Sequence, residues 1–202
     1  ITQVINESTD DEKCNSIEAI RKELCQSEKE IQITDFGAGS TINNSKTRKV
    51  KDIAKNSAKN AKFGKLLYRI IRFYKPKNIL ELGTSLGIST SYLAKADINA
   101  NVFTFEGCPA TATIAQENFN KQTIKNISIT LGDFNLTLAN KLKEILTIDL
   151  AFIDGNHQEQ PTIDYFEQCL KYANNNTIFI FDDIHWSQGM ENAWNYIEKH
   201  EK

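Results

Sequence analysis

The stretch Asn78-Ile-Leu-Glu-Leu-Gly-Thr-Ser-Leu-Gly-Ile-Ser-Thr-Ser-Tyr-Leu-Ala94 decides the fold of this chain. Its apolar run, Ile79 to Leu82, predicts a strand that leads into a loop around Gly83 and Gly87. The loop opens an amphipathic helix, and we expect Ser89 to Ser91 to lie at the exposed start of that helix. In an open α/β sheet, such a strand, loop and helix form the place where a nucleotide-like ligand binds.

A second apolar run, Asn101-Val-Phe-Thr-Phe, ends at Glu106, about twenty residues after the glycine loop. A carboxylate at this strand end can accept hydrogen bonds from both hydroxyl groups of a ribose. The glycine spacing and the later acid together favour a nucleoside-containing cofactor.

The loop Glu81-Leu-Gly83-Thr-Ser-Leu-Gly87 resembles the first motif of class I S-adenosylmethionine (SAM) methyltransferases, and Glu106 stands at the acidic position of the second motif. Many members carry a glycine at the position of Ser85. The variant of the loop with serine there is similar to that of catechol-type O-methyltransferases and of certain metal-dependent sugar O-methyltransferases. A dehydrogenase would require G-x-G-x-x-G, which this loop lacks. The resemblance implies SAM as cofactor, with these residues at its site: Glu81, Gly83, Thr84, Ser85, Gly87, Ser89, Thr90 and Glu106.

The next predicted strand ends in Leu131-Gly-Asp133-Phe134. The resemblance implies that Asp133 accepts a hydrogen bond from the adenine amino group and that Phe134 packs on the adenine ring. The residues alone allow another interpretation, in which Asp133 caps the helix that starts at Asn135.

Three carboxylates follow the last two predicted strands: Asp154, Asp182 and Asp183. They should lie together beside the reactive methyl group, where they repel one another unless a cation or protons intervene. The arrangement is similar to metal-dependent O-methyltransferases, although many catechol-type enzymes carry Asp-Asn in the last pair. The resemblance therefore implies an oxygen-ligated Mg²⁺, Ca²⁺ or Mn²⁺, and it makes Asp154 a cofactor-binding and catalytic residue as well. The alternative is that all three carboxylates cap turns or bond backbone amides.

His157 follows Asp154 closely and can act as a general base or contact the substrate, because an imidazole titrates near neutral pH. His185 is a weaker candidate by the same argument, and His200 in the charged tail is expected to be structural. Trp186 either walls the acceptor site or packs in the core.

With 202 residues, 40% of them hydrophobic, the chain has room for one α/β core and a small appendage. The formal net charge of -2 gives no reason to expect nucleic acid as partner. The segment from Lys46 to Lys77 is rich in Lys and Arg with Asp52 as its only acid, and we interpret it as a solvated helix face rather than a phosphate- or RNA-binding patch.

Four isolated cysteines show no metal-ligand spacing and indicate a reducing compartment, so the expected location is cytoplasmic. No apolar run reaches membrane-spanning length, and no membrane partner is expected. The expected partner is a small-molecule substrate, and a homodimer is left open.

Residues 1–45 are expected to form an N-terminal cap, with a loose start, a helix over 16–30 and a glycine turn within 31–40. That turn also resembles a SAM loop, but no apolar helix follows it. Residues 46–202 are expected to form the SAM-binding domain, a Rossmann-like, doubly wound, mainly parallel sheet with helices on both faces. The predicted elements are one or two helices over 48–74, strands 79–83, 101–106, 127–130, 148–153 and 177–182, and helices 87–96, 110–121, 135–146, 160–172 and 189–200.

The resembling fold closes its sheet with two more strands, so we expect a C-terminal truncation that leaves the strand with Ile178 to Phe181 as an uncovered edge. The function that the resemblance implies is methyl transfer from SAM to an oxygen of a small molecule. Methylation of RNA or protein and a non-catalytic SAM-binding or scaffold module are the alternatives.

Overall fold

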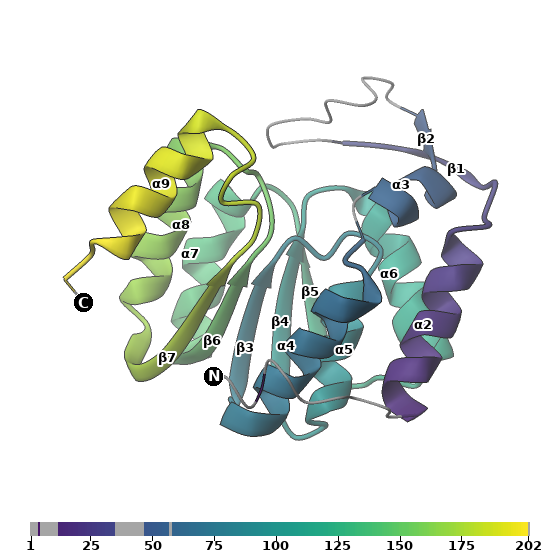
Figure 1. Cartoon of the computed structure of the whole chain (residues 1–202), viewed down its shortest axis with the longest axis horizontal. Helices are drawn as coiled ribbons and strands as arrows, with labels where there is room; N and C mark the ends of the chain where they lie inside the picture. Colours follow the sequence, from purple (N-terminus) through teal and green to yellow (C-terminus); the bar gives the residue numbers. More distant parts are fainter. Residues whose placement is uncertain (1–3, 5–11, 35–46, 57, 202) are drawn as a thin grey trace.

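A computed structural model describes residue 4 and residues 12–34, 47–56 and 58–201 of the chain. Its centre is a five-stranded parallel sheet with the strand order β5-β4-β3-β6-β7 (Figure 1). The order reverses between β3 and β6, which creates the switch point where open α/β sheets bind ligands. The strands are β3 (Asn78–Leu82), β4 (Asn101–Glu106), β5 (Ile127–Leu131), β6 (Ile148–Ile153) and β7 (Ala173–Phe181).

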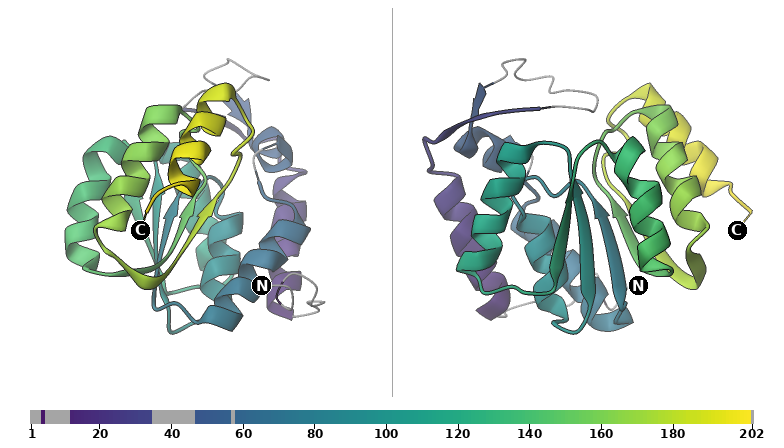
Figure 2. Two further views of the ribbon diagram at one scale, coloured as in Figure 1. Left: turned by 60° about the vertical axis from the view of Figure 1, so that its left-hand side comes forward. Right: turned by 180° about the vertical axis from the view of Figure 1, so that it is seen from behind.

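Helices cover both faces of this sheet, as Figure 2 shows from two further sides. One face carries α4 (Ala61–Tyr74), α5 (Ile88–Ala96) and α6 (Pro109–Lys121), with α2 (Glu12–Leu24) outside them. The other face carries α7 (Phe134–Ile145) and α8 (Glu159–Leu170), and α9 (Gln188–Glu198) packs beside α8. The predicted doubly wound α/β fold is confirmed.

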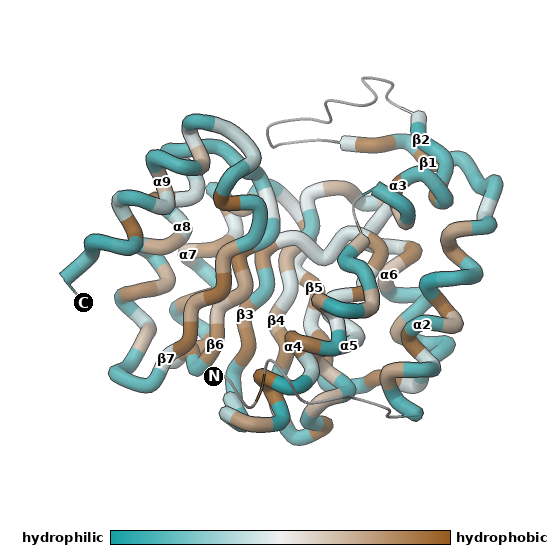
Figure 3. The backbone as a smooth tube through the Cα atoms, in the orientation of Figure 1, coloured by the Kyte–Doolittle hydropathy of each residue, from teal (hydrophilic) through white to brown (hydrophobic). Residues whose placement is uncertain are grey.

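The two-residue period of the strands divides the core between the two faces. On β3, Ile79 packs with the α4 and α5 side, whereas Leu80 and Leu82 pack with the α7 and α8 side. The hydrophobic residues accordingly concentrate on the strands between the helical layers (Figure 3). Because both faces of the sheet are covered, the strands are nearly continuous apolar runs, which is why the sequence revealed them.

The N-terminal segment differs from the expectation. α2 begins at Glu12 and ends at Leu24, so it lies earlier than the helix predicted over 16–30. The chain then forms β1 (Glu30–Gln32), which pairs antiparallel with β2 (Thr47–Lys49) ahead of α3 (Val50–Asn56). The carbonyls of Ser27 and Lys29 accept from the Lys51 and Val50 amides at the start of α3, so they are not available to a longer helix.

The expected domain boundary at 45/46 stays a prediction, since residues 35–46 lie outside the described part. Cys14 and Ile17 of α2 are fully buried in the same cluster as Ile79, so the helix is packed on the main domain. The glycine turn within 31–40 lies mostly outside the described residues as well.

Most other boundaries agree with the prediction to within two residues. α4 ends at Tyr74, and its C-cap Lys75 adopts φ 50° before Pro76, as expected for a residue that proline keeps out of the right-handed helical region. β7 begins at Ala173, four residues before the predicted start at 177, because Asn174 and Asn176 make an irregular, hydrogen-bonded lead-in to the regular strand.

β7 is the edge of the sheet, and no strand of the described residues pairs with its outer side. Among the described residues, no helix combines the length and apolar character needed to cross a membrane. The four cysteines are free thiols.

Candidate active site

The glycine loop after β3 is held against two neighbouring strands. The amides of Gly83 and Thr84 both donate to the Phe105 carbonyl of β4 at 3.0 Å. Gly83 has φ 107°, and a Cβ atom at this position would lie 2.1 Å from the Asp154 carbonyl oxygen at the end of β6. The absence of a side chain at Gly83 therefore lets the ends of β3 and β6 approach each other.

Glu106 is fixed at the end of β4 by backbone donors. Its Oε2 accepts from the Ser85 amide at 2.6 Å, and its Oε1 accepts from the Cys108 amide at 2.9 Å. Burial raises the pKa of Glu106, while these two hydrogen bonds act in the opposite direction. Ser85 adopts a left-handed conformation with φ 49°, which is unfavourable for a residue other than glycine. Many members of the resembling family carry glycine at this position.

Beneath the loop, Glu81 is fully buried and lies at the centre of a hydroxyl network. Its Oε2 accepts from Thr90 at 2.5 Å and from Thr104 at 2.7 Å. Thr104 uses its proton on Glu81, so the 2.6 Å contact between Thr84 and Thr104 has Thr84 as donor. Burial raises the pKa of Glu81 to about 7, and its Oε1 is buried without a hydrogen-bond partner among the described residues.

The start of α5 is less exposed than the sequence suggested. Gly87 is its N-cap with φ 81°, and an added Cβ would lie 2.6 Å from the Phe119 ring of α6. Ser89 and Thr90 are buried, and Thr90 is committed to Glu81. The expectation of an exposed first turn was wrong because α6 packs across it, and a cofactor contact by these side chains stays a prediction.

Asp133 and Phe134 stand at the start of α7. Asp133 is the N-cap, accepting from the Asn135 amide at 2.9 Å, so the capping interpretation is confirmed. The Phe134 ring makes edge contacts with Phe105 and Tyr165, at centroid distances of 6.1 and 5.9 Å. Their predicted contacts with adenine are not tested by this arrangement.

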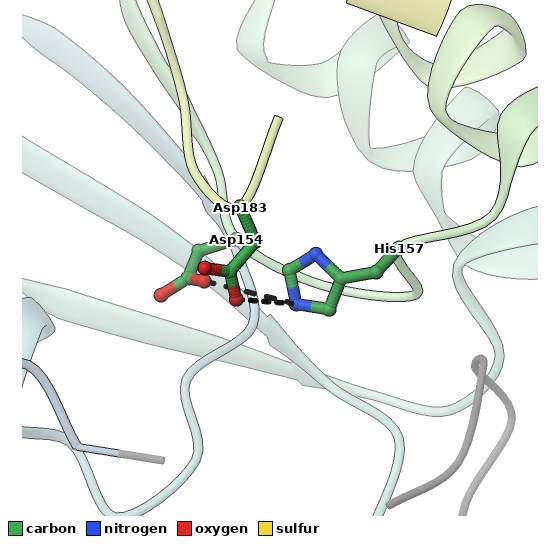
Figure 4. Close-up of side chains that lie close together, drawn as sticks. All are labelled: Asp154, His157 and Asp183. Carbon is green, nitrogen blue, oxygen red and sulfur yellow. Dashed lines mark ion pairs between the residues drawn. The ribbon is translucent and has the colours of Figure 1, made fainter. Parts of the chain in front are cut away.

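Asp154, His157 and Asp183 converge beyond the ends of β6 and β7 (Figure 4). His157 Nε2 lies 3.9 Å from Asp154 Oδ1 and 3.9 Å from Asp183 Oδ2. Burial raises the pKa of Asp154 to about 7 and lowers the pKa of His157 below its usual 6.5. The imidazole is therefore mainly neutral at pH 7 and able to accept a proton.

The backbone around this cluster is unusual. Seven non-glycine residues of the described part have positive φ, and four of them, at positions 85, 156, 157 and 183, lie in the loops at this edge of the sheet. Asn156 (φ 71°) donates to the Tyr165 hydroxyl at 2.9 Å, which anchors the loop that carries His157. Strained backbone of this kind gathers at functional sites.

Lys59 also reaches this cluster, from the loop between α3 and α4. Its Nζ lies 3.1 Å from Asp154 Oδ1 and contacts Asp182 Oδ2. The sequence placed Lys59 in a solvated basic segment, so this contact was missed. The break between two helices at this point was the available signal.

The predicted metal ligands Asp154, Asp182 and Asp183 are thus divided. Lys59 pairs with Asp182 and with Asp154, whereas the group with potential ligand atoms within 4.8 Å of one another consists of Asp154, Asp183 and His157. A divalent ion between Asp154 and Asp182 does not fit the charges as they stand, because the Lys59 ammonium is already there. The metal stays a prediction.

The remaining aromatic candidates lie at the periphery. Trp186 is half exposed, with its ring centroid 6.4 Å from that of His157, and its predicted role as a wall of the acceptor site stays a prediction. His185 is exposed and lies 3.4 Å from Glu191. His200 pairs with Glu167 at 3.1 Å and packs on Phe166, in agreement with a structural role.

The parallel sheet, the glycine loop at its switch point and the acidic end of β4 define a Rossmann-like nucleotide-binding domain. Residues 80–184 match the family described as "Methyltransferase domain". This match spans more than half of the sequence, and the chain belongs to that family.

A curated relative, the catechol O-methyltransferase of Niastella koreensis, is 31% identical over 124 residues, which is 60% of this chain and 55% of the relative. The chain thus matches only about half the length of that relative. The O-methyltransferase of Bacillus cereus in complex with SAH has a TM-score of 0.68 at 19% identity, covering 99% of this chain and 84% of that one. The SAH-bound methyltransferase PaMTH1 of Podospora anserina has a TM-score of 0.65 at 17% identity, covering 96% and 90%. At these identities the two structures bear on the fold alone.

Proposed function

We propose that this protein transfers a methyl group from SAM to an oxygen of a small molecule. The observation that carries the proposal is the position of His157, a half-buried imidazole with a lowered pKa that lies 3.9 Å from Asp154, the residue whose carbonyl approaches Gly83 at the switch point. The family of the chain, and the O-methyltransferase activity in the name of its Niastella relative, support the same reaction class.

The residues at the switch point fit SAM as a ligand. Glu106 is held by the amides of Ser85 and Cys108 and keeps further lone pairs for the ribose hydroxyls. Glu81 Oε1 is a buried acceptor without a hydrogen-bond partner in the described part, which suits a cationic cofactor. The roles of Asp133 and Phe134 toward adenine remain part of the proposal.

When bound, SAM supplies a methyl group already activated by a positively charged sulfur. The protein's own task is then to orient the acceptor and to remove its proton. In the proposed step His157 Nε2 takes the proton of the acceptor hydroxyl as the new carbon–oxygen bond forms and the electron pair of the broken bond passes to sulfur. Asp154 and Asp183, both 3.9 Å from Nε2, stabilise the imidazolium that results.

A cytoplasmic location is proposed on the four free cysteines, which fit a reducing compartment. The small-molecule acceptor is favoured over RNA or protein because the formal net charge of -2 gives no general attraction for nucleic acid and because the Niastella relative is named for methylation of a catechol. The homodimer stays a prediction.

Two measurements test the proposal. Calorimetric titration with SAM should show one site per chain, and incubation with tritiated-methyl SAM and fractionated cell extract should label the small-molecule fraction. Label in RNA or protein would favour those acceptors, and SAM binding without transfer to any fraction would favour a non-catalytic module. A folded protein that does not bind SAM would contradict the proposal.

A further inference from the structure

Lys59 places a positive charge inside the acid cluster of the candidate active site. Its ammonium bridges Asp154, at the end of β6, and Asp182, at the end of β7. The Lys59 side chain is 17% exposed and that of Asp154 is 12% exposed, so the pair is largely withdrawn from solvent. An ammonium with little water around it requires such partners, which makes this contact more than a surface ion pair.

The position of Lys59 is fixed by the start of the helix that follows it. α4 begins directly after Asn60, whose side chain accepts from the Phe63 amide at 3.1 Å and fixes the start of the helix. Lys59 immediately precedes this cap, so the anchored end of α4 defines where its side chain starts. Lys62, on the first turn of α4, is exposed by contrast.

The charged groups around Lys59 lie close enough to interact electrostatically with one another. Asp183 lies beside Asp154, facing the same Nε2 of His157, and the Lys59 charge contributes to lowering the pKa of His157. Glu81 interacts electrostatically with Asp154 from beneath the loop. Lys59 thus compensates part of the negative charge that gathers at the ends of β6 and β7.

We propose that the Lys59 ammonium is the resident cation of this site, in the position between Asp154 and Asp182 that would otherwise suit a divalent ion, and that it binds the acceptor oxygen. The inference rests on the proposed methyl transfer. A lysine ammonium has three N–H donors, and Lys59 forms ion pairs with two carboxylates. A donor that points away from these carboxylates can bind one acceptor oxygen, whose developing negative charge it stabilises while His157 takes the proton.

The first test needs no activity. Free Mn²⁺ is measured by electron paramagnetic resonance during titration of wild type, Lys59→Met, Lys59→Arg and, as matched control, the exposed Lys62→Met. Removing the ammonium leaves the carboxylates uncompensated, so Lys59→Met should bind Mn²⁺ at least about tenfold more tightly than wild type. Lys59→Arg and Lys62→Met should resemble wild type, and adding Asp182→Asn to Lys59→Met should remove the gain.

Equal Mn²⁺ affinity of wild type and Lys59→Met would overturn the proposal, whether both bind or neither does. A thermal melt and a SAM titration of each variant check that the fold and cofactor site persist. If SAM binds to none of the proteins, the proposed function fails, whereas the Mn²⁺ comparison still decides the role of Lys59.

The second test uses the methyl-transfer assay. Wild-type transfer should persist in EDTA, Lys59→Met should lose it, Lys59→Arg should retain part of it, and Mn²⁺ should restore part of it to Lys59→Met. Loss of wild-type transfer in EDTA, with recovery on adding a divalent ion, would show that a metal and not Lys59 is the working cation.

Discussion

Replacing Glu81 by Gln should make the stability of the protein less sensitive to pH. Glu81 is fully buried, and its pKa rises from 4.5 in the unfolded chain to about 7 in the fold, chiefly because of burial. A carboxyl group with a raised pKa contributes stability that is present below pH 4.5 and lost as pH rises through 7. One pKa unit corresponds to about 1.4 kcal/mol, so the loss amounts to roughly 3 kcal/mol.

Glu81→Gln removes this titration while its amide oxygen can still accept from Thr90 and Thr104. The amide nitrogen takes the place of Oε1, which has no partner among the described residues, and this adds a cost of about 1–3 kcal/mol that does not depend on pH. The free energy of unfolding of the variant relative to wild type should therefore rise by roughly 3 kcal/mol between pH 4.5 and 8.

Urea unfolding followed by circular dichroism at several pH values measures this difference directly. Thr90→Val, which removes a hydrogen bond to the ionised carboxylate, should move the midpoint of the wild-type stability loss to higher pH, and Thr90→Ser should leave it in place. A difference between variant and wild type that stays constant within about 0.5 kcal/mol over this range would refute the reasoning.

Three further outcomes are expected. Glu106→Ala should weaken SAM binding by roughly 30- to 150-fold, the equivalent of about 2–3 kcal/mol for a lost charge-assisted pair, and unchanged affinity in calorimetry would remove Glu106 from the cofactor site. Gly83→Val should destabilise the fold by more than about 2 kcal/mol, because its Cβ would meet the Asp154 carbonyl at 2.1 Å and φ is 107°, whereas Gly189→Ala should melt close to wild type. His157→Ala should lower kcat by about 10²- to 10⁴-fold. The wild-type rate should fall as the pH is lowered through the pKa of His157, which lies below 6.5, and the rate of the variant should not show this fall. A wild-type rate independent of pH would argue against the imidazole as base.

Much of the fold could be predicted from the sequence because its signals are local. The apolar strands covered on both faces, the helical periodicity and the glycine loop each act within a few residues, and the alternation of strands and helices restricts the topology. The position of Glu106 at the end of β4 followed in the same way. The prediction was weakest for the end of α2, where hydrogen bonds between the backbone carbonyls of residues 27 and 29 and the amides at the start of α3 overrode a helical pattern.

The sequence by itself determined the α/β class, the switch-point loop and the gathering of Asp154, His157 and Asp183 at one edge, because the carboxyl ends of parallel strands meet there. Only the tertiary structure decided how charge is balanced at that edge. Lys59 is 95 residues before Asp154 in the numbering, and no local pattern distinguishes it from the other lysines of its segment. Its pairing with Asp154 and Asp182, like the burial that brings the pKa of Glu81 to about 7, depends on contacts between distant segments and on exclusion of water, which exist only once the helices are packed on the sheet.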